Sequence, residues 1–198
     1  MTDPTNPDPS PQEPSSWFRS YMEAYRESLF ETDVAAELAA FRDLIVETKD
    51  NAGKLVFAGN GASAAISSHA AVDFTKQCGV RSICFNEADL ITCFANDYGF
   101  ERWVEKAVDF YGDAGDLLIV ISSSGSSENM LNGVKGARNG NFKAVVTLSG
   151  FAEDNPLCQL GDINLWINSR AYNFVENIHQ VWLLAIVDLI IGKREYLA

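Results

Sequence analysis

Residues 116–129 read Asp116-Leu117-Leu118-Ile119-Val120-Ile121-Ser122-Ser123-Ser124-Gly125-Ser126-Ser127-Glu128-Asn129. The apolar first half predicts a buried strand, and a helical pattern begins directly after the serine cluster. Five hydroxyls and several backbone N–H groups therefore gather at the start of a helix, where the helix dipole favours an anion. The loop has no basic side chain, so we expect the phosphate monoester of a small molecule. A solvated turn with a serine N-cap is the alternative interpretation.

Beyond Gly53 the chain alternates short apolar runs with helical patterns. The predicted strands are 54–58, 82–85, 116–122, 143–148 and 163–168. The predicted helices are 62–77, 90–110 with a bend near Asn96-Asp97-Tyr98-Gly99, 127–138 and 174–191. Strands separated by helices imply parallel pairing with right-handed crossovers. We therefore predict an α/β fold: a three-layer α/β/α sandwich with a five-stranded, mainly parallel, flavodoxin-like sheet. Its ligand crevice lies outside the carboxyl ends of the strands.

Two amphipathic helical patterns, over 17–29 and 34–45, precede the first strand. Five of the six prolines lie within residues 1–14, mixed with Asp, Ser, Thr and Asn. Such a composition buries too little apolar surface to offset the entropy lost on ordering. We therefore expect a disordered proline-rich arm over residues 1–15. Residues 16–198 are expected to form a single domain with an N-terminal helical extension.

The composition narrows the class of partner and the compartment. A net charge of −12 argues against nucleic acid and against a membrane surface. The four cysteines have no C-x-x-C spacing, and the acidic start of the chain lacks the apolar segment of a signal peptide. We expect a cytoplasmic protein with free thiols. The apolar stretch 181–191 is about half as long as a membrane span and contains Asp188, so it predicts a buried helix.

A glycine-rich loop, Gly59-Asn60-Gly61-Ala62-Ser63-Ala64, follows the first predicted strand. It matches the G-x-G-x-x-A form of the dinucleotide fingerprint, and Glu87 stands where a ribose partner is expected. A tight turn between strand and helix is another interpretation. The serine loop on a neighbouring strand end favours a monophosphate, which needs converging hydroxyls. We therefore expect no nucleotide cofactor.

Four motifs in order carry a resemblance to a known family. They are Gly59-Asn60-Gly61-Ala62-Ser63, Ala95-Asn96-Asp97-Tyr98-Gly99-Phe100, Ala114-Gly115-Asp116-Leu117-Leu118 and Ile121-Ser122-Ser123-Ser124-Gly125-Ser126-Ser127. Together they resemble the sugar isomerase (SIS) domain family, and within it the phosphoheptose isomerases, from about Trp17 to the C-terminus. The resemblance implies a homotetramer with active sites near subunit boundaries, and a ligand that carries a sugar phosphate.

The same resemblance implies roles for individual positions. The phosphate-binding hydroxyls of the family match Ser63, Ser122, Ser124 and Ser127, with Ser123 at the adjacent loop position. Residues that hold sugar hydroxyls in the family match Asn60 and Asp97. Asn60 could instead cap its own turn, and Asp97 could cap the next helix.

Isomerisation of a ketose phosphate needs a base beside the carbonyl, and an acid or metal to stabilise the enediolate. His69 and Asp73 are four residues apart on one predicted helix, and Glu176 and His179 are three apart on another. If the two helices converge, these side chains suit a zinc site with two histidines and two carboxylates. His69, Asp73 and Glu176 are the candidate catalytic residues. Either histidine could instead be hydrogen-bonded within a helix interface.

The family resemblance also implies a zinc site of His, Glu, Gln and His. His69 matches the first ligand, but Asp73 stands in place of the Glu and Glu176 in place of the Gln. Leu184 occupies the position of the final His, and a leucine neither binds metal nor transfers a proton. The zinc expected here would therefore have only His69, Asp73 and Glu176 as ligands.

Two functions follow from these observations. The first is aldose–ketose isomerisation, with sedoheptulose 7-phosphate converted to the D-glycero-D-manno-heptose 7-phosphate used for surface polysaccharide. Glu176 or Asp73 would serve as base, and a related isomerase acting on another phosphosugar is the alternative. The second is phosphosugar binding without turnover in a regulatory or assembly role, as in the branch of the family that binds a replication initiator. Intact phosphate loops beside an incomplete proton-transfer set suit the second function.

Overall fold

The computed structural model describes residues 13–194, and the chain divides into two compact units, Met1–Asp33 and Val34–Ala198. Residues 1–12, which hold most of the proline-rich arm predicted from the sequence, lie outside the described residues.

The first unit contains one helix, α1 (Pro14–Phe30). The helix begins three residues before the predicted start because the Glu13 carboxylate accepts hydrogen bonds from the N–H groups of Ser15 and Ser16. Pro14 occupies the first helical position, where a missing N–H costs nothing. The helix has no fully buried side chain, and its Trp17, Phe18 and Phe30 are exposed.

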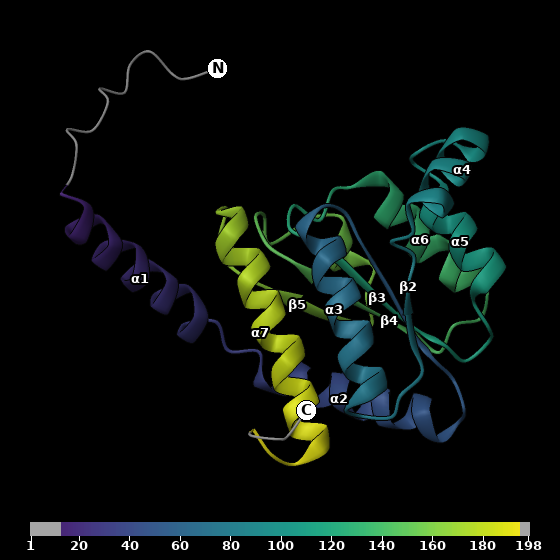
Figure 1. Ribbon diagram of the computed structural model, residues 1–198, viewed down its shortest axis with the longest axis horizontal. Helices are drawn as coiled ribbons and strands as arrows, with labels where there is room; N and C mark the ends of the chain where they lie inside the picture. The colour runs from purple at the N-terminus through teal and green to yellow at the C-terminus, as the bar shows by residue number, and fades with distance from the viewer. Residues whose placement is uncertain (1–12, 195–198) are drawn as a thin grey trace. The chain divides into compact units, whose positions relative to one another are not determined.

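The second unit is built on a parallel sheet with strand order β2-β1-β3-β4-β5 (Figure 1). The strands are β1 (Leu55–Gly59), β2 (Ser82–Cys84), β3 (Leu117–Ser122), β4 (Ala144–Ser149) and β5 (Ile163–Trp166). The helices are α2 (Ala35–Asp50), α3 (Ala62–Lys76), α4 (Ala88–Tyr98), α5 (Trp103–Tyr111), α6 (Glu128–Asn139) and α7 (Tyr172–Ile191). This order is that of the flavodoxin-like doubly wound sheet, so the predicted fold class is confirmed.

The sheet is buried on both faces because its strands are apolar at nearly every position. All residues of β1, β3 and β4 are buried. On one face, Phe57 stacks on Phe74 of α3 with ring centroids 5.9 Å apart. On the other, alternate strand residues such as Val56 join a cluster with Trp103 of α5 and Met130 of α6. The result is the predicted arrangement of helices on both sides of one sheet.

Two connections differ from the sequence prediction. The helical region predicted over 90–110 is two helices, because Gly99 adopts a φ of +88° at the end of α4. A short 3-10 helix, η1 (Leu157–Gln159), lies between β4 and β5 where the sequence predicts no helix. Its position is set by backbone contact with the serine loop, since the N–H of Leu157 donates to the carbonyl of Gly125 at 2.9 Å.

Helix α7 contains the apolar stretch 181–191, for which the sequence predicts a buried helix. The helix runs for 20 residues and, among the described residues, is the one helix long and apolar enough to cross a membrane. In this structure it packs beside α2 and α3 (Figure 1), with Val175, Ile178 and Leu183 fully buried. These contacts are those of a core helix, as the sequence predicts.

Candidate functional site

The two loops singled out in the sequence meet at the carboxyl end of the sheet. Strands β1 and β3 are neighbours, and Gly59 at the end of β1 pairs with Ile121 near the end of β3. The glycine loop then enters α3, and the serine loop enters α6. A Cβ on Gly59 would lie 2.6 Å from the backbone of Ser63, so only glycine lets the loop fold back this closely. The N-termini of both helices therefore point to the same place.

A cavity of about 110 Å³ lies between these loops and the start of α7. Its lining residues come from all three segments: Asn60, Ser63, Ile121, Ser122, Ser123, Ser124, Ser127, Tyr172 and Glu176. All five serines predicted to bind phosphate are among them. The structure thus brings together the predicted phosphate residues, one of the two predicted sugar residues and one of the three predicted catalytic residues.

The polar groups of this cavity are incompletely hydrogen-bonded within the described protein. The Ser123 hydroxyl is buried and makes no hydrogen bond. Ser127 is the N-cap residue of α6, yet its side chain does not cap the helix. The contact from the Ser122 hydroxyl to Ser127 is long, at 3.4 Å. Helix α3 also begins without a side-chain cap. These groups favour a ligand site over the alternative of a serine-capped turn, because buried polar atoms are normally hydrogen-bonded.

The electrostatics of the cavity come from helix ends and one carboxylate. None of the lining residues is basic. The positive ends of α3 and α6 are the attraction for an anion, and the hydroxyls can donate to it. Partial burial raises the pKa of Glu176 above its usual value. A carboxylate of this kind can accept a proton at neutral pH more readily than an ordinary surface glutamate.

His69 and Asp73 lie together but outside this cavity. The Nε2 atom of His69 is 3.1 Å from the carboxylate of Asp73, and the His69 side chain is half exposed on α3. The cavity lining includes neither of them. The cavity is lined by residues from the first turns of α3 and α7. Asp73 lies roughly 16 Å along α3 from that helix's first residue, whereas Glu176 lies only roughly 6 Å along α7 from its first residue.

The predicted metal set is therefore not assembled within one chain. Among residues 13–194, no group of three or more His, Cys, Asp or Glu side chains is placed to share a metal ion. Leu184, at the position where the family resemblance implies a histidine, is partly buried on α7 and offers no ligand atom. Within one chain, these residues do not fit the zinc site that the resemblance implies.

His179 is a core histidine rather than a site residue. Its ring is fully buried, and burial lowers its pKa to about 4, so the ring is neutral at physiological pH. The Nε2 atom lies 3.2 Å from the carbonyl oxygen of Ser149. A carbonyl can only accept, so the proton resides on Nε2, and Nδ1 has no hydrogen-bond partner in the described part of the chain. The sequence left open a histidine hydrogen-bonded within a helix interface; the structure instead bonds this buried histidine to the last residue of strand β4.

Asp97 is not brought to the cavity within one chain. It is exposed near the end of α4, where its carboxylate accepts a hydrogen bond from the side chain of Asn96 at 2.8 Å. Asp97 does not line the cavity, so its predicted contact with sugar hydroxyls stays a prediction.

Two residues at the site were missed from the sequence. Tyr172 lines the cavity, and its ring contacts Phe151 in a T-shaped arrangement with centroids 4.9 Å apart. Its position four residues before Glu176 on one helix face was a usable signal. Asn129 lies behind the cavity and exchanges two hydrogen bonds with Asn60. No sequence spacing links these two asparagines, which are 69 residues apart.

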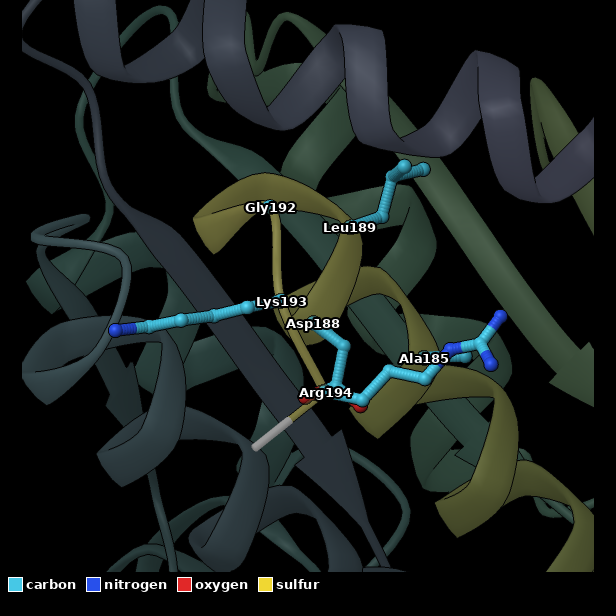
Figure 2. A pocket seen from close by; sticks show the side chains of 6 residues that line it. All are labelled: Ala185, Asp188, Leu189, Gly192, Lys193 and Arg194. Atoms are coloured by element: carbon cyan, nitrogen blue, oxygen red, sulfur yellow. The ribbon is translucent and has the colours of Figure 1, made fainter. Parts of the chain in front are cut away.

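A larger cavity of about 490 Å³ lies at the opposite end of α7 (Figure 2). It is lined by Ala185, Asp188, Leu189, Gly192, Lys193 and Arg194. Figure 2 shows the Lys193 and Arg194 side chains extending in opposite directions, so their charges do not converge on one ligand. The smaller serine-lined cavity is the better candidate, because five serines, an asparagine and a glutamate line it together.

Comparison with known proteins gives consistent matches. A family model described as SIS domain matches residues 17–150. A phosphoheptose isomerase of Aliarcobacter butzleri is 33% identical over 154 residues, which are 74% of this chain and 80% of that protein. One from Helicobacter pylori is 30% identical over 179 residues, 87% of this chain and 91% of that protein. Among solved structures, a phosphoheptose isomerase from Francisella tularensis matches with a TM-score of 0.85 and 26% identity, covering 92% of this chain and 100% of that one.

Proposed function

This chain belongs to the SIS domain family, and from that membership we propose that it is a phosphoheptose isomerase. The proposed reaction converts sedoheptulose 7-phosphate to D-glycero-D-manno-heptose 7-phosphate, a precursor of surface polysaccharide. The observation that carries the proposal is the convergence of five serine hydroxyls and two uncapped helix N-termini on one cavity that also contains a carboxylate.

The serine-lined cavity is proposed to hold the phosphoryl group. Hydroxyls and helix N–H groups can donate to the phosphate oxygens, and the two helix dipoles oppose the repulsion from a chain of net charge −12. The volume of about 110 Å³ is well below the roughly 300 Å³ at which sites for whole small molecules begin. The cavity therefore suits one end of the ligand, with the sugar extending past Asn60 and Tyr172.

The proposed base is Glu176. Its carboxylate lines the cavity, and its raised pKa suits proton abstraction from C1 of the ketose. Because the phosphate is on C7, this role requires the sugar chain to fold back in the site so that C1 reaches the carboxylate. Return of that proton to C2 and transfer of the hydroxyl proton from O1 to O2 completes the aldose, with no net change in atoms or electrons.

We propose a cytoplasmic homotetramer as the working form. His69 on α3 and Asp97 on α4 are exposed, and Asp73, which pairs with His69, is partly buried, so a neighbouring subunit could use these groups. Val181 and Leu189 of α7 are also apolar and exposed, as expected of a helix that packs against another subunit. In this proposal, the rest of the sugar site is completed across a subunit boundary.

Phosphosugar binding without turnover is the second candidate function. Leu184 is the observation that favours it, since the family resemblance implies a histidine that moves protons at this position. In that case the cavity would hold a sugar phosphate as a signal, and Glu176 would not act as a base.

One assay separates the two functions. Purified protein is incubated with sedoheptulose 7-phosphate, with and without added zinc, and aldose formation is followed by chromatography. Thermal stabilisation by the same ligand reports binding. Aldose formation supports the isomerase, and comparison of the rates with and without zinc tests whether turnover needs the metal. Stabilisation without aldose in either arm supports the binding protein. If the ligand is not converted and does not stabilise the protein, both functions are refuted.

A further inference from the structure

Asn60 and Asn129 form a reciprocal pair of amide hydrogen bonds. The side-chain N–H of Asn60 donates to the carbonyl oxygen of Asn129 at 3.0 Å, and that of Asn129 donates to the oxygen of Asn60 at 2.9 Å. Asn60 lines the cavity, whereas Asn129 is almost completely buried behind it. The pair therefore joins the glycine loop after β1 to the first turn of α6, which follows the serine loop.

This pairing fixes the orientation of the Asn60 amide. If one amide turned over alone, N–H would face N–H and oxygen would face oxygen, so each side chain holds the other in place. An asparagine amide has two N–H groups and two acceptor positions. Asn129 uses one of each, and the two bonds above account for the side-chain hydrogen bonds of Asn60 within the described chain. One donor and one acceptor of Asn60 are therefore left for a ligand.

The location of Asn129 argues for a role beyond holding α6 together. It is the second residue of α6, and Ser127, two residues earlier, lines the cavity. Burying an amide is costly unless its partners are well placed, and here the partner is a residue of the candidate site. Asn132 offers a contrast on the same helix, since its amide donates to the backbone carbonyl of Glu101 at 2.9 Å, away from the cavity.

We propose that Asn129 is a positioning residue that sets the donor and acceptor of Asn60 for one hydroxyl of the sugar. This inference rests on the proposed phosphosugar site and assigns to it a buried determinant of sugar recognition. Asn129 itself touches no ligand. Asn129 therefore affects binding of the sugar, whereas the serines and helix N-termini bind the phosphoryl group.

The test compares two probes in a double-mutant cycle. Dissociation constants for inorganic phosphate and for sedoheptulose 7-phosphate are measured by calorimetry on the full chain. The variants are Asn60→Ala, Asn129→Ala, the double variant, and Asn129→Leu, which keeps the buried volume. Asn132→Ala is the matched control, and thermal melting checks that each variant folds.

We expect Asn129→Ala and Asn129→Leu to weaken sugar phosphate binding about 3- to 10-fold, with inorganic phosphate affinity changed less than about twofold. In the Asn60→Ala background, Asn129→Ala should have no further effect. Equal losses for both probes, or losses that add in the double variant, would overturn the positioning role. A wild-type chain that binds neither probe would refute the proposed function and this inference with it.

Discussion

The two ends of the parallel sheet both bury polar side chains, but they differ in whether those side chains have partners. At the amino end, Lys54 precedes β1 and Asp116 precedes β3. The Asp116 carboxylate accepts bonds from the Lys54 side chain at 2.5 Å, from the Lys54 N–H at 2.9 Å and from the Asp113 N–H at 2.8 Å. At the carboxyl end, the Ser123 hydroxyl is buried without a hydrogen bond, and the Ser127 side chain does not cap α6.

This contrast distinguishes structural polar groups from functional ones. Burial alone would lower the pKa of Lys54, but hydrogen bonds from its ammonium to Asp113 and Asp116 outweigh burial and raise it. The charges at the amino end are thus satisfied within the chain and stabilise the fold. At the carboxyl end, the buried Ser123 hydroxyl has no partner within the described chain, and a phosphate oxygen in the proposed site would supply one. Substitutions at the two ends should therefore separate stability from activity.

The largest effect is expected from Glu176→Gln at the carboxyl end. Removing a general base should lower kcat about 10²- to 10⁴-fold, while the free energy of unfolding and phosphate affinity stay nearly unchanged. Steady-state kinetics and urea unfolding measure the two quantities. Asp188→Asn, roughly 18 Å further along the same helix, is the control that should keep full activity. Turnover unaffected by Glu176→Gln would remove the glutamate from the mechanism.

At the amino end, Asp116→Ala should act in the opposite way. It leaves the Lys54 ammonium with only the exposed Asp113 as partner, and we expect the free energy of unfolding to fall by about 3–5 kcal/mol. The fraction that remains folded should bind phosphate as the wild type does. Asp113→Ala, at the exposed member of the trio, should have a smaller effect on urea unfolding. If phosphate affinity fell as sharply as stability, the two ends would not be independent.

His179 sharpens the comparison because it is a buried group that faces the core rather than the cavity. Its folded-state pKa of about 4 lies below the unfolded value of 6.5, so the unfolded chain binds a proton first as the pH falls. The free energy of unfolding should therefore decrease from pH 6.5 towards pH 4, by at most about 3 kcal/mol. Denaturant unfolding at several pH values measures this, and His179→Gln should flatten this part of the profile. An unchanged slope in that variant would contradict the assignment.

Ser123→Ala is expected to have the smallest effect, with opposite signs on binding and stability. Removing an unpaired buried hydroxyl should leave the free energy of unfolding unchanged or slightly increased. Inorganic phosphate should bind about tenfold more weakly, because a donor to the anion is lost. Ser126→Ala is the control, since Ser126 is exposed and does not line the cavity. A loss of stability without loss of binding would assign Ser123 to the fold instead.

The sequence predicted the strand positions well, because a strand buried on both faces reads as a continuous apolar run. β3, predicted over 116–122, is Leu117–Ser122, and β4, predicted over 143–148, is Ala144–Ser149. Helix limits were less predictable. α1 starts at Pro14 because of the Glu13 side chain, and the 90–110 region divides at Gly99, whose positive φ ends α4. These limits depend on single caps and single backbone angles.

The site was predicted in part. The serines, Asn60 and Glu176 share one cavity, because their loops follow adjacent strands or begin a neighbouring helix. The spacing of His69 and Asp73 correctly predicted that their side chains meet. Spacing within one helix does not predict which residues of another helix lie beside them, so it did not predict that Glu176 lines a cavity without them. The roles of these residues, and of Asp97, stay predictions.

By itself, the sequence determined the sheet, the family and the positions of the glycine and serine loops, because apolar periodicity and short motifs are local properties of the chain. Only the tertiary structure decided which polar groups are satisfied. Lys54 and Asp116 are 62 residues apart, and Asn60 and Asn129 are 69 apart, so their pairing depends on strand order and register. These long-range partners decide whether a buried polar side chain is hydrogen-bonded within the fold or remains available to a ligand. No local sequence pattern encodes such partners.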